Sequence, residues 1–319
     1  MLRKALLYLS NQQRVFDFVR NNTLAKSFAS RFVAGETIEE AVRAVAALNA
    51  TGITASLDLL GESVTDEREA RDAGRQYMHM LDRIHEHRLQ ANVSVKLTAM
   101  GQDISEDLCV AIMHDILGRA RDYGSFVRLD MESSAYTDRT LRLFEDRLYP
   151  NYPENVGIVL QSMLRRTAQD VEHAIQLRCR VRICKGAYLE PETVAYPDKA
   201  DVDASYVRCM KALMERGNYP GIATHDEKII AEAKRFATEQ GIARDRFEFQ
   251  MLYGVRRDLQ EQLVREGYRM RVYVPFGTQW YPYLMRRLAE RPANVAFMTG
   301  NVVKEMVGGR KNGNGKRPG

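Results

Sequence analysis

The chain has 319 residues, of which 45% are hydrophobic and 28% are charged, with a formal net charge of +5. This composition argues against a disordered or fibrous chain and is typical of a globular protein with a large core. No apolar run approaches the ~18 residues that a membrane-spanning helix needs. No linker rich in Pro, Gly or Ser divides the interior, so we expect one large domain.

Both ends of the chain are predicted to lie outside that domain. Residues 1–50 are expected to form a helical arm, in which Thr37 and Glu40 have the spacing of a capping box. The apolar stretch at 5–9 resembles a weak signal sequence, but no small-residue cleavage site follows, so an amphipathic helix without export is favoured. Residues 308–319 are basic and glycine-rich and are predicted to be a disordered tail.

The cysteines and the basic tail indicate where in the cell the protein is expected to be found. No C-x-x-C pair occurs among the four cysteines, so disulfide and metal frameworks are not expected and a reducing cytoplasm fits. The tail permits weak attraction to anionic lipid or nucleic acid, although a solvated tail without a partner is favoured. We expect no nucleic-acid partner. The first helix and the tail are candidates for peripheral contact with the inner face of the cell membrane.

From residue 51 onward, short runs rich in β-branched residues alternate with longer segments of helical periodicity. The predicted strands are 53–60, 92–98, 126–131, 156–162, 180–184, 221–225, 247–252 and 270–274. The predicted helices between them are 67–87, 103–123, 138–148, 168–176, 204–216, 227–240 and 256–266. This alternation predicts a parallel α/β sheet, and eight units favour closure into a (β/α)8 barrel, residues 51–307 including a C-terminal helix. The alternative is an open doubly wound sheet, but no G-x-G-x-x-G fingerprint occurs.

The chemistry of such a barrel gathers at the carboxyl ends of its strands. On the second predicted strand Ser94, Lys96 and Thr98 share one face, so Lys96 is expected to point into the barrel. A buried lysine needs a partner, and Asp130 stands at a comparable height on the next strand. We therefore predict a Lys96–Asp130 ion pair, with an outward-pointing Lys96 as the alternative.

Other predicted strands also end in polar groups. Arg182 and Lys185 precede Gly186, which would let a ligand approach the backbone, and this combination suits a phosphate or an electron-rich ring. Thr224 and His225 could hold a phosphate, the alternative being a histidine satisfied within the core. Neither H-x-H nor H-E-x-x-H nor G-x-S-x-G occurs, so a catalytic metal is not expected and an organic cofactor is favoured.

The segment 283–291 carries two adjacent arginines, whose guanidinium groups can grip a carboxylate from two directions. On a helix Tyr283, Arg286, Arg287 and Glu290 fall on a common side. That face could recognise a small amino or imino acid. A solvated helix with Arg–Glu pairs is the alternative.

Five segments carry a resemblance to a known family: 95–97, 129–132, 182–188, 223–225 and, most specifically, 283–291. The chain resembles the proline dehydrogenase family, in its single-function bacterial form, over nearly its full length. The resemblance implies a distorted barrel with a substrate-capping C-terminal helix and non-covalent FAD. It also implies oxidation of L-proline to 1-pyrroline-5-carboxylate by hydride transfer from proline C5 to the flavin, the first step of proline catabolism to glutamate. Electrons would pass to a membrane quinone, and a separate pyrroline-5-carboxylate dehydrogenase would be a partner.

The resemblance also assigns roles to individual residues. Catalytic roles fall to Asp130, Arg182 and Tyr273. The binding of proline falls to Lys96, Tyr283, Arg286, Arg287 and Glu290, with Asp130 expected to orient Lys96. Flavin contacts fall to Met131, Gln161, Arg182, Lys185, Gly186, Ala187, Tyr188, Thr224 and His225. Leu189 departs from the tryptophan of some relatives, which leaves the flavin packing there open.

Two other functions remain open on the residues alone. One is a Schiff-base aldolase that uses Lys96 or Lys185 on a barrel strand. The other is a barrel that binds amino acids without catalysis.

Overall fold

The computed structural model describes residues 30–61 and 64–290, with side chains described up to residue 285. The chain divides into two compact units, Ala34–Thr278 and a unit that combines Met1–Val33 with Gln279–Gly319. In the second unit the described part contains helix α12, Trp280–Glu290. Helix α4, expected in an N-terminal arm, lies in the first unit. The predicted helix near residues 5–9 and the tail at 308–319 lie outside the described residues, so the predicted domain boundaries stay predictions.

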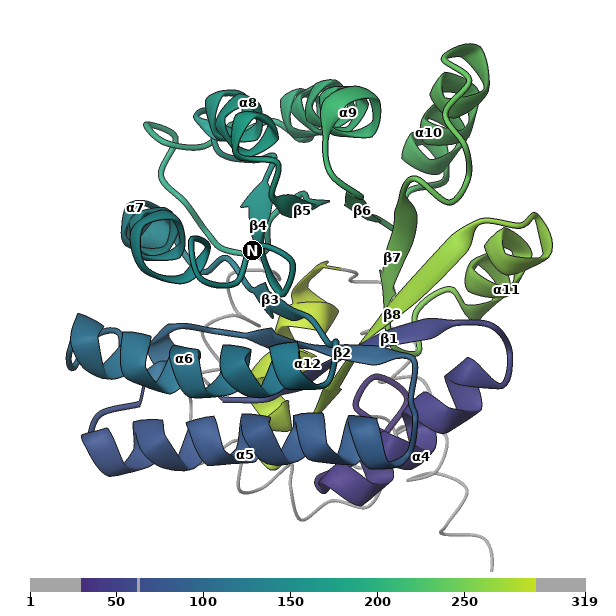
Figure 1. Ribbon diagram of the computed structural model, residues 1–319. Coiled ribbons are helices and arrows are strands. Elements are labelled where there is room, and N and C mark those ends of the chain that lie inside the picture. The colour runs from purple at the N-terminus through teal and green to yellow at the C-terminus, as the bar shows by residue number, and fades with distance from the viewer. Residues whose placement is uncertain (1–29, 62–63, 291–319) are drawn as a thin grey trace, which may run out of the picture. The chain divides into compact units, whose positions relative to one another are not determined.

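The unit Ala34–Thr278 is a closed barrel of eight parallel strands in chain order, in which β8 pairs with β1 (Figure 1). The strands are β1 Thr54–Leu59, β2 Ala91–Val95, β3 Val127–Leu129, β4 Val156–Gln161, β5 Arg180–Cys184, β6 Gly221–Ala223, β7 Glu248–Leu252 and β8 Arg269–Phe276. The predicted (β/α)8 barrel is confirmed, and the open-sheet alternative is wrong.

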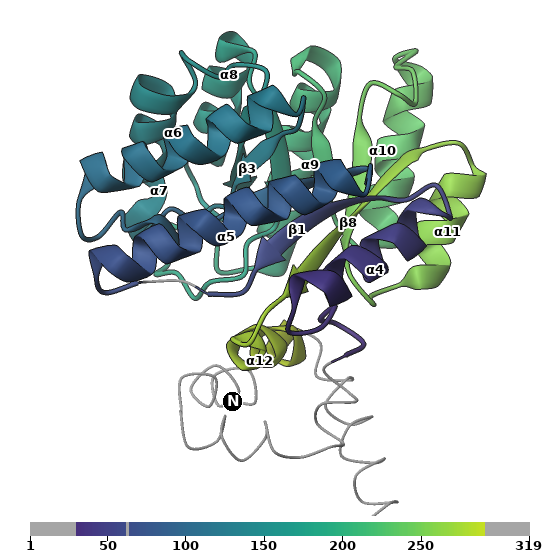
Figure 2. The same cartoon turned by 60° about the horizontal axis from the view of Figure 1, so that its bottom comes forward.

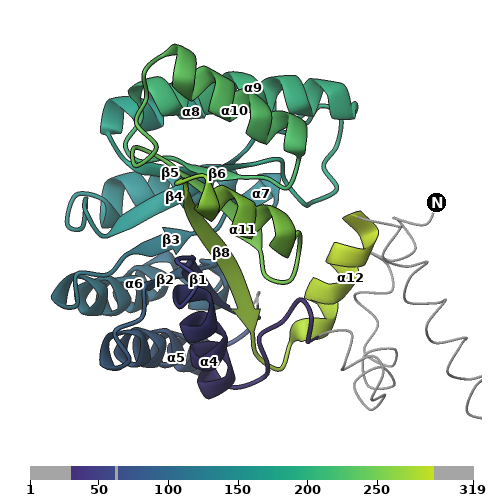
Figure 3. The same cartoon turned by 90° about the vertical axis from the view of Figure 1, so that its right-hand side faces the viewer.

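Helices surround the barrel, as predicted. They are α4 Ile38–Asn49, α5 Glu67–Glu86, α6 Glu106–Asp122, α7 Ser134–Leu143, α8 Thr167–Leu177, α9 Lys199–Arg216, α10 Glu227–Glu239 and α11 Arg257–Arg265. Helices α5 and α6 lie side by side (Figures 1 and 2), as do α8, α9 and α10 (Figures 1 and 3). No helix in residues 30–61 and 64–290 combines the length and apolarity needed to cross a bilayer.

Local sequence explains where these elements begin and end. The capping box of α4 is present, since the Thr37 hydroxyl accepts from the Glu40 N–H and the Glu40 carboxylate accepts from the Thr37 N–H. Strand β2 ends earlier than predicted because the chain turns into a 3-10 helix at Thr98–Met100. The residues of that turn are buried, and a buried run cannot be distinguished from a strand by its hydrophobicity.

The interior of the barrel is polar. Barrel interiors of this fold are usually filled by branched apolar side chains. Here Arg182 on β5 donates across the barrel to Ser56 on β1, Ser94 on β2 and Gln250 on β7. The apolar core instead lies between strands and helices, and includes side chains such as that of Tyr77. This polar interior is where the candidate site is built.

Candidate active site

The three predicted catalytic side chains meet: Asp130 follows β3 directly, Arg182 lies on β5 and Tyr273 lies on β8. Arg182 Nη1 donates to Asp130 Oδ1 at 2.8 Å, and the Tyr273 hydroxyl donates to Asp130 Oδ2 at 2.8 Å. The Arg182 guanidinium also lies 5.3 Å from the centroid of the Tyr273 ring, a cation–π distance. Both oxygens of the Asp130 carboxylate are therefore engaged, and the cluster forms a closed triangle.

Arg182 is held on every nitrogen. Besides Asp130, it donates from Nε to Gln250 Oε1 at 2.5 Å, and from Nη2 to Ser94 Oγ at 3.2 Å and Ser56 Oγ at 3.5 Å. A guanidinium carries five N–H donors. With four partners within the described part of the chain, one N–H, on Nη1, is left for a bound molecule. Because the side chain is buried, its direction is set by the barrel and not by solvent.

The phenol of Tyr273 remains protonated. Burial raises the pKa of Tyr273 well above its usual value, and the neighbouring charge of Asp130 raises this pKa further. Tyr273 can therefore act as a hydrogen-bond donor at neutral pH but not as an anion.

The predicted Lys96–Asp130 ion pair is wrong. Lys96 Nζ lies 3.0 Å from Oδ1 of Asp58, which is on the adjacent strand β1 and only 1% exposed. Asp130 is already occupied by Arg182 and Tyr273. The alternative of an outward-pointing Lys96 is also wrong, since its side chain is buried.

Lys96 is a cation in this setting. Burial alone lowers the pKa of Lys96, but the charges of Asp58 and Asp130 outweigh burial and hold this pKa above its ordinary value. Asp130 therefore acts on Lys96 through its charge, without a direct bond. A buried ammonium group at the barrel mouth can attract a carboxylate.

Gln161, at the end of β4, offers an acceptor for a ligand. Its Nε2 donates to the carbonyls of Met131 at 2.9 Å and Glu132 at 3.0 Å, which fixes the orientation of the amide. Its Oε1 is buried and has no hydrogen-bond partner among the described residues. Since buried polar atoms are nearly always paired, this oxygen fits a bound molecule that carries a donor.

The ends of β5 and β6 form a network of charged and polar groups. Lys185 Nζ lies 2.6 Å from Asp203 Oδ1 and 2.9 Å from Asp226 Oδ2. The Thr224 hydroxyl accepts from the Asp226 N–H at 3.1 Å. His225 Nε2 accepts from the Leu252 N–H at 3.0 Å, which requires a ring nitrogen without a proton there. The structure thus brings Lys185, Thr224 and His225 together.

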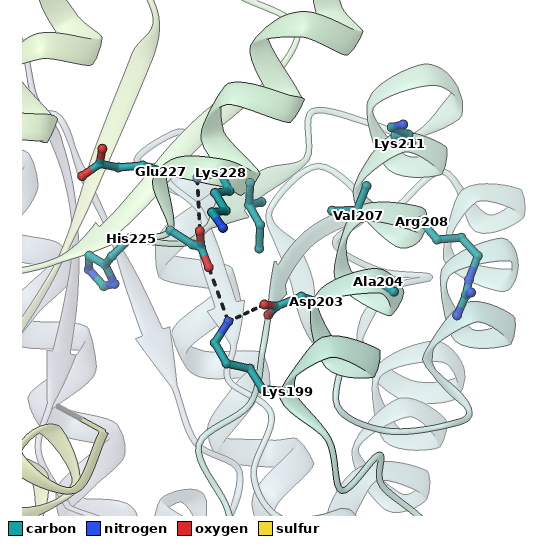
Figure 4. A pocket seen from close by; sticks show the side chains of 11 residues that line it. Lys199, Asp203, Ala204, Val207, Arg208, Lys211, His225, Glu227 and Lys228 are labelled. Atoms are coloured by element: carbon teal, nitrogen blue, oxygen red, sulfur yellow. Dashed lines mark hydrogen bonds and ion pairs between the residues drawn. The ribbon is translucent and has the colours of Figure 1, made fainter. Parts of the chain in front are cut away.

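Beside this network lies a pocket of about 1040 Å³ between α9 and α10 (Figure 4). Its lining residues are Lys199, Asp203, Ala204, Val207, Arg208, Lys211, His225, Asp226, Glu227, Lys228 and Ile229. Figure 4 shows Lys199 reaching Asp203, with which it forms an ion pair. The lining combines four cationic side chains with three carboxylates, so it can hold a polar anionic group.

The loop after β5 is shaped by its own packing. Gly186 has φ +108°, and a Cβ there would overlap the sulfur of Met163. The positive φ therefore favours glycine at this position, and a larger residue would also have to displace the flexible side chain of Met163. Tyr188 packs on the small cluster that contains Met163, while Leu189 is 55% exposed. Ala187, between Gly186 and Tyr188, is partly buried.

The predicted arginine clamp is only partly described. The predicted helix exists as α12, and Tyr283 on it is buried. The side chains of Arg286, Arg287 and Glu290 lie outside the described residues. Their grip on a carboxylate, and the capping of a substrate by α12, stay predictions. Among the described residues no group of three or more metal-binding side chains occurs.

Comparison with known proteins decides the family. The model of the family described as proline dehydrogenase matches residues 41–300. This chain belongs to the proline dehydrogenase family. A proline dehydrogenase of Deinococcus radiodurans is 44% identical over 307 residues, which cover 95% of this chain and 98% of that protein. Proline dehydrogenase 1 of Bacillus subtilis is 41% identical over 305 residues, which cover 96% of this chain and 100% of that protein.

The fold agrees with solved structures of the same family. Proline utilization A from Bdellovibrio bacteriovorus, solved after inactivation by N-propargylglycine, matches with a TM-score of 0.78 and 29% identity. The match covers 87% of this chain and 34% of that one, so this chain corresponds to about a third of the larger protein.

Membership in the proline dehydrogenase family makes the chain an oxidoreductase of proline catabolism. The charge state of Lys96 argues against the alternative of a Schiff-base aldolase. A Schiff-base lysine needs a lowered pKa, whereas the pKa of Lys96 is raised. Lys185, the other candidate, is engaged by two carboxylates.

Sequence reasoning missed two residues of the site. Asp58 shares a strand face with Ser56, and this pair of polar side chains in the buried strand β1 could have indicated an inward carboxylate. No role in the site is predicted for Gln250 from the sequence, although Glu248 and Gln250 share a face of β7. Both patterns are visible in the sequence, but the partners of these residues are not.

Proposed function

We propose that this chain oxidises L-proline to 1-pyrroline-5-carboxylate by hydride transfer from proline C5 to FAD, and that the electrons then pass to a membrane quinone. The observation that carries the proposal is the buried cluster of Asp130, Arg182 and Tyr273 in a barrel of this family. The cluster offers one spare guanidinium N–H and a protonated phenol. The Lys96 cation supplies a site for a carboxylate.

The residues present fit FAD. The unpaired Gln161 Oε1 suits an N–H donor of a flavin ring, and the mixed-charge pocket beside Lys185 suits a dinucleotide diphosphate. Bound FAD would supply the acceptor of the hydride that leaves C5. The residues proposed to hold it are Met131, Gln161, Arg182, Lys185, Gly186, Ala187, Tyr188, Thr224 and His225.

The substrate would be held by complementary charge. We assign the proline carboxylate to Lys96, Arg286 and Arg287, with Glu290 steadying the arginines. Tyr273 and Tyr283 are proposed to pack on the proline ring. The main contribution of the protein is then to position the proline and to exclude water from around it. Loss of a proton from the ring nitrogen to solvent frees its lone pair, and this pair forms the C5=N bond as the hydride departs.

The test is an absorption spectrum of the purified protein before and after anaerobic addition of L-proline. We expect the visible bands of a flavin, and their bleaching by L-proline but not by D-proline. A protein that binds flavin yet does not bleach would overturn proline as the substrate. A lysine labelled by borohydride in the presence of substrate would instead support the aldolase.

The electron acceptor needs a separate measurement. We expect turnover with a soluble quinone and none with NAD⁺, because the chain has no dinucleotide fingerprint for NAD⁺. The product would then be consumed by a separate pyrroline-5-carboxylate dehydrogenase. Turnover with NAD⁺ alone would contradict the assignment of a quinone at a peripheral membrane contact.

A further inference from the structure

A buried glutamine lies directly beneath the candidate active site. Gln250 on β7 is 5% exposed, and its Oε1 accepts the Nε–H of Arg182 at 2.5 Å. Its Nε2 donates to Glu248 Oε1 at 2.6 Å. The amide oxygen of Gln250 therefore faces a donor, and its amide nitrogen faces an acceptor.

Glu248 is itself held in place. Its Oε1 accepts from Arg271 Nε at 2.7 Å, and its Oε2 accepts from the Tyr219 hydroxyl at 3.1 Å. Burial raises the pKa of Glu248, but Arg271 outweighs burial and leaves this pKa below its ordinary value. Glu248 is thus a carboxylate, and it can only accept hydrogen bonds.

A reversed amide would fail at both ends. Turning the Gln250 side chain by half a turn would set its NH₂ group against the Arg182 Nε–H and its oxygen against the Glu248 carboxylate. Donor would then face donor, and acceptor would face acceptor. The adjacent strand β6 also makes room for this amide, since a Cβ at Gly221 would overlap Gln250 Nε2.

We propose that Gln250, oriented by Glu248, is a positioning residue that sets the direction of the Arg182 guanidinium. The inference rests on the proposed proline oxidation, in which Arg182 touches the reacting molecules. Of the four hydrogen bonds that Arg182 forms with described residues, the one to Gln250 is the shortest and the only one made by Nε. Losing it leaves the guanidinium held only through its Nη atoms, by Asp130 and by the two longer contacts to the serines, so its orientation is less tightly fixed.

The first variant is Gln250→Met, which keeps the approximate volume of the side chain and removes both hydrogen bonds. We expect kcat per bound flavin to fall roughly tenfold or more, because small misplacements of a catalytic group are costly. The KM for proline should change less than about twofold, because Lys96 is untouched. An unchanged kcat would overturn the proposal.

The matched control is Gln260→Met. Gln260 on α11 is equally buried, at 2% exposure, and its amide donates to the carbonyls of Leu252 and Val255. Neither hydrogen bond of this amide involves Arg182. We expect kcat to stay within about twofold of the parent value, since this variant lowers the stability of the protein but leaves the orientation of the Arg182 guanidinium unchanged. Equal losses of kcat in both variants would reduce Gln250 to a structural role.

A double variant that exchanges the side chains at positions 248 and 250 tests the direction of the hydrogen bond between them. Gln250→Glu alone places two carboxylates together, and Glu248→Gln alone replaces the charged acceptor of the amide by a neutral one and weakens its anchor, so both should lower kcat. Combining Glu248→Gln with Gln250→Glu restores an acceptor for Arg182 Nε and a donor between the two positions. We expect the double variant to recover most of the kcat lost by Gln250→Glu; no recovery would count against the proposal.

A readout without turnover separates this inference from the proposed function. In protein labelled with ¹⁵N-arginine, the Arg182 Nε–H resonance is identified by its loss in Arg182→Lys. It should be protected from solvent exchange in the parent chain and lose protection in Gln250→Met but not in Gln260→Met. A parent chain that fails to oxidise proline while showing this difference would refute the function alone. An active parent with unchanged protection in Gln250→Met would refute the positioning role alone.

Discussion

The Asp58–Lys96 pair shows how one side chain depends on another inside this barrel. Lys96 is buried and Asp58 is 1% exposed, so neither charge is hydrated enough to be stable alone. A buried pair gains little over a well-packed apolar pair, but breaking it leaves an uncompensated charge. The pair is therefore a point of vulnerability, and it keeps a cation where the substrate carboxylate is proposed to bind.

We predict that Asp58→Asn lowers the free energy of unfolding by about 3–5 kcal/mol, because the Lys96 ammonium group loses its closest counter-charge. Urea unfolding at neutral pH measures the change. The exposed pair Arg71–Glu67, with side chains 50% and 61% exposed, is the control, and Arg71→Met should cost less than about 1 kcal/mol. Asp58→Leu combined with Lys96→Met should recover much of the loss. If the combined variant is less stable than Asp58→Asn, the explanation by unpaired charge is wrong.

At the scale of the element, one glycine determines how β4 fits between its neighbours. Gly157 pairs with Arg128 on β3 and with Arg180 on β5. Arg128 Nη1 donates to the carbonyls of Arg180 at 2.6 Å and Ile158 at 3.1 Å, so the guanidinium lies against the backbone of these strands. A Cβ at Gly157 would overlap the Arg180 carbonyl and lie 2.7 Å from Arg128 Nη1. The strand can approach the arginine this closely only because it lacks a side chain there.

Gly157→Ala is therefore predicted to destabilise the barrel by about 1–3 kcal/mol, since backbone atoms cannot move aside without shifting a strand. Gly118→Ala is the opposite case. In helix α6 the nearest atom to its Cβ would be the Tyr152 hydroxyl at 4.0 Å, so alanine should stabilise by about 0.5–1 kcal/mol. Thermal unfolding of both variants measures whether each substitution raises or lowers the stability. A stabilising Gly157→Ala would contradict the crowding at β4.

On the scale of the whole molecule, the described carboxyl groups make the folded state sensitive to acid. Eight of them have a pKa below the ordinary value: Glu40, Glu172, Asp203, Asp226, Glu232, Glu248, Asp258 and Glu266. Hydrogen bonds from Arg235 and Lys211 lower the pKa of Glu232 from 4.5 to about 2. A lowered pKa means that the folded state binds fewer protons than the unfolded state. The stabilisation is therefore complete above the unfolded pKa and is lost as the pH falls through the folded one.

We predict that the free energy of unfolding falls steadily as the pH is lowered from about 5 to about 2. Glu232→Gln should reduce stability at pH 7 and make the decline between pH 4.5 and 2 less steep. Glu261→Gln is the control, because that carboxylate is 60% exposed and lies 3.7 Å from Arg265. Urea unfolding at several pH values gives both slopes. A Glu232→Gln variant that declines as steeply as the parent chain would show that this carboxyl does not contribute.

The sequence by itself determined the elements and the family. Alternating β-branched runs and helical segments predicted all eight strands, and Thr37 with Glu40 predicted the start of α4, because strand and helix periods and end caps are local properties. The family resemblance assigned catalytic roles to Asp130, Arg182 and Tyr273, and the structure brings these three side chains into contact.

Only the tertiary structure decided which inward-facing residues are partners. Lys96 pairs with Asp58, which lies 38 residues away on an adjacent strand, and Arg182 reaches Gln250 across 68 residues. Side-chain alternation shows that each of these residues faces inward, but every inward charge then has several candidate partners at similar heights. The height, tilt and closure of the strands select among them, and these exist only once the barrel has closed.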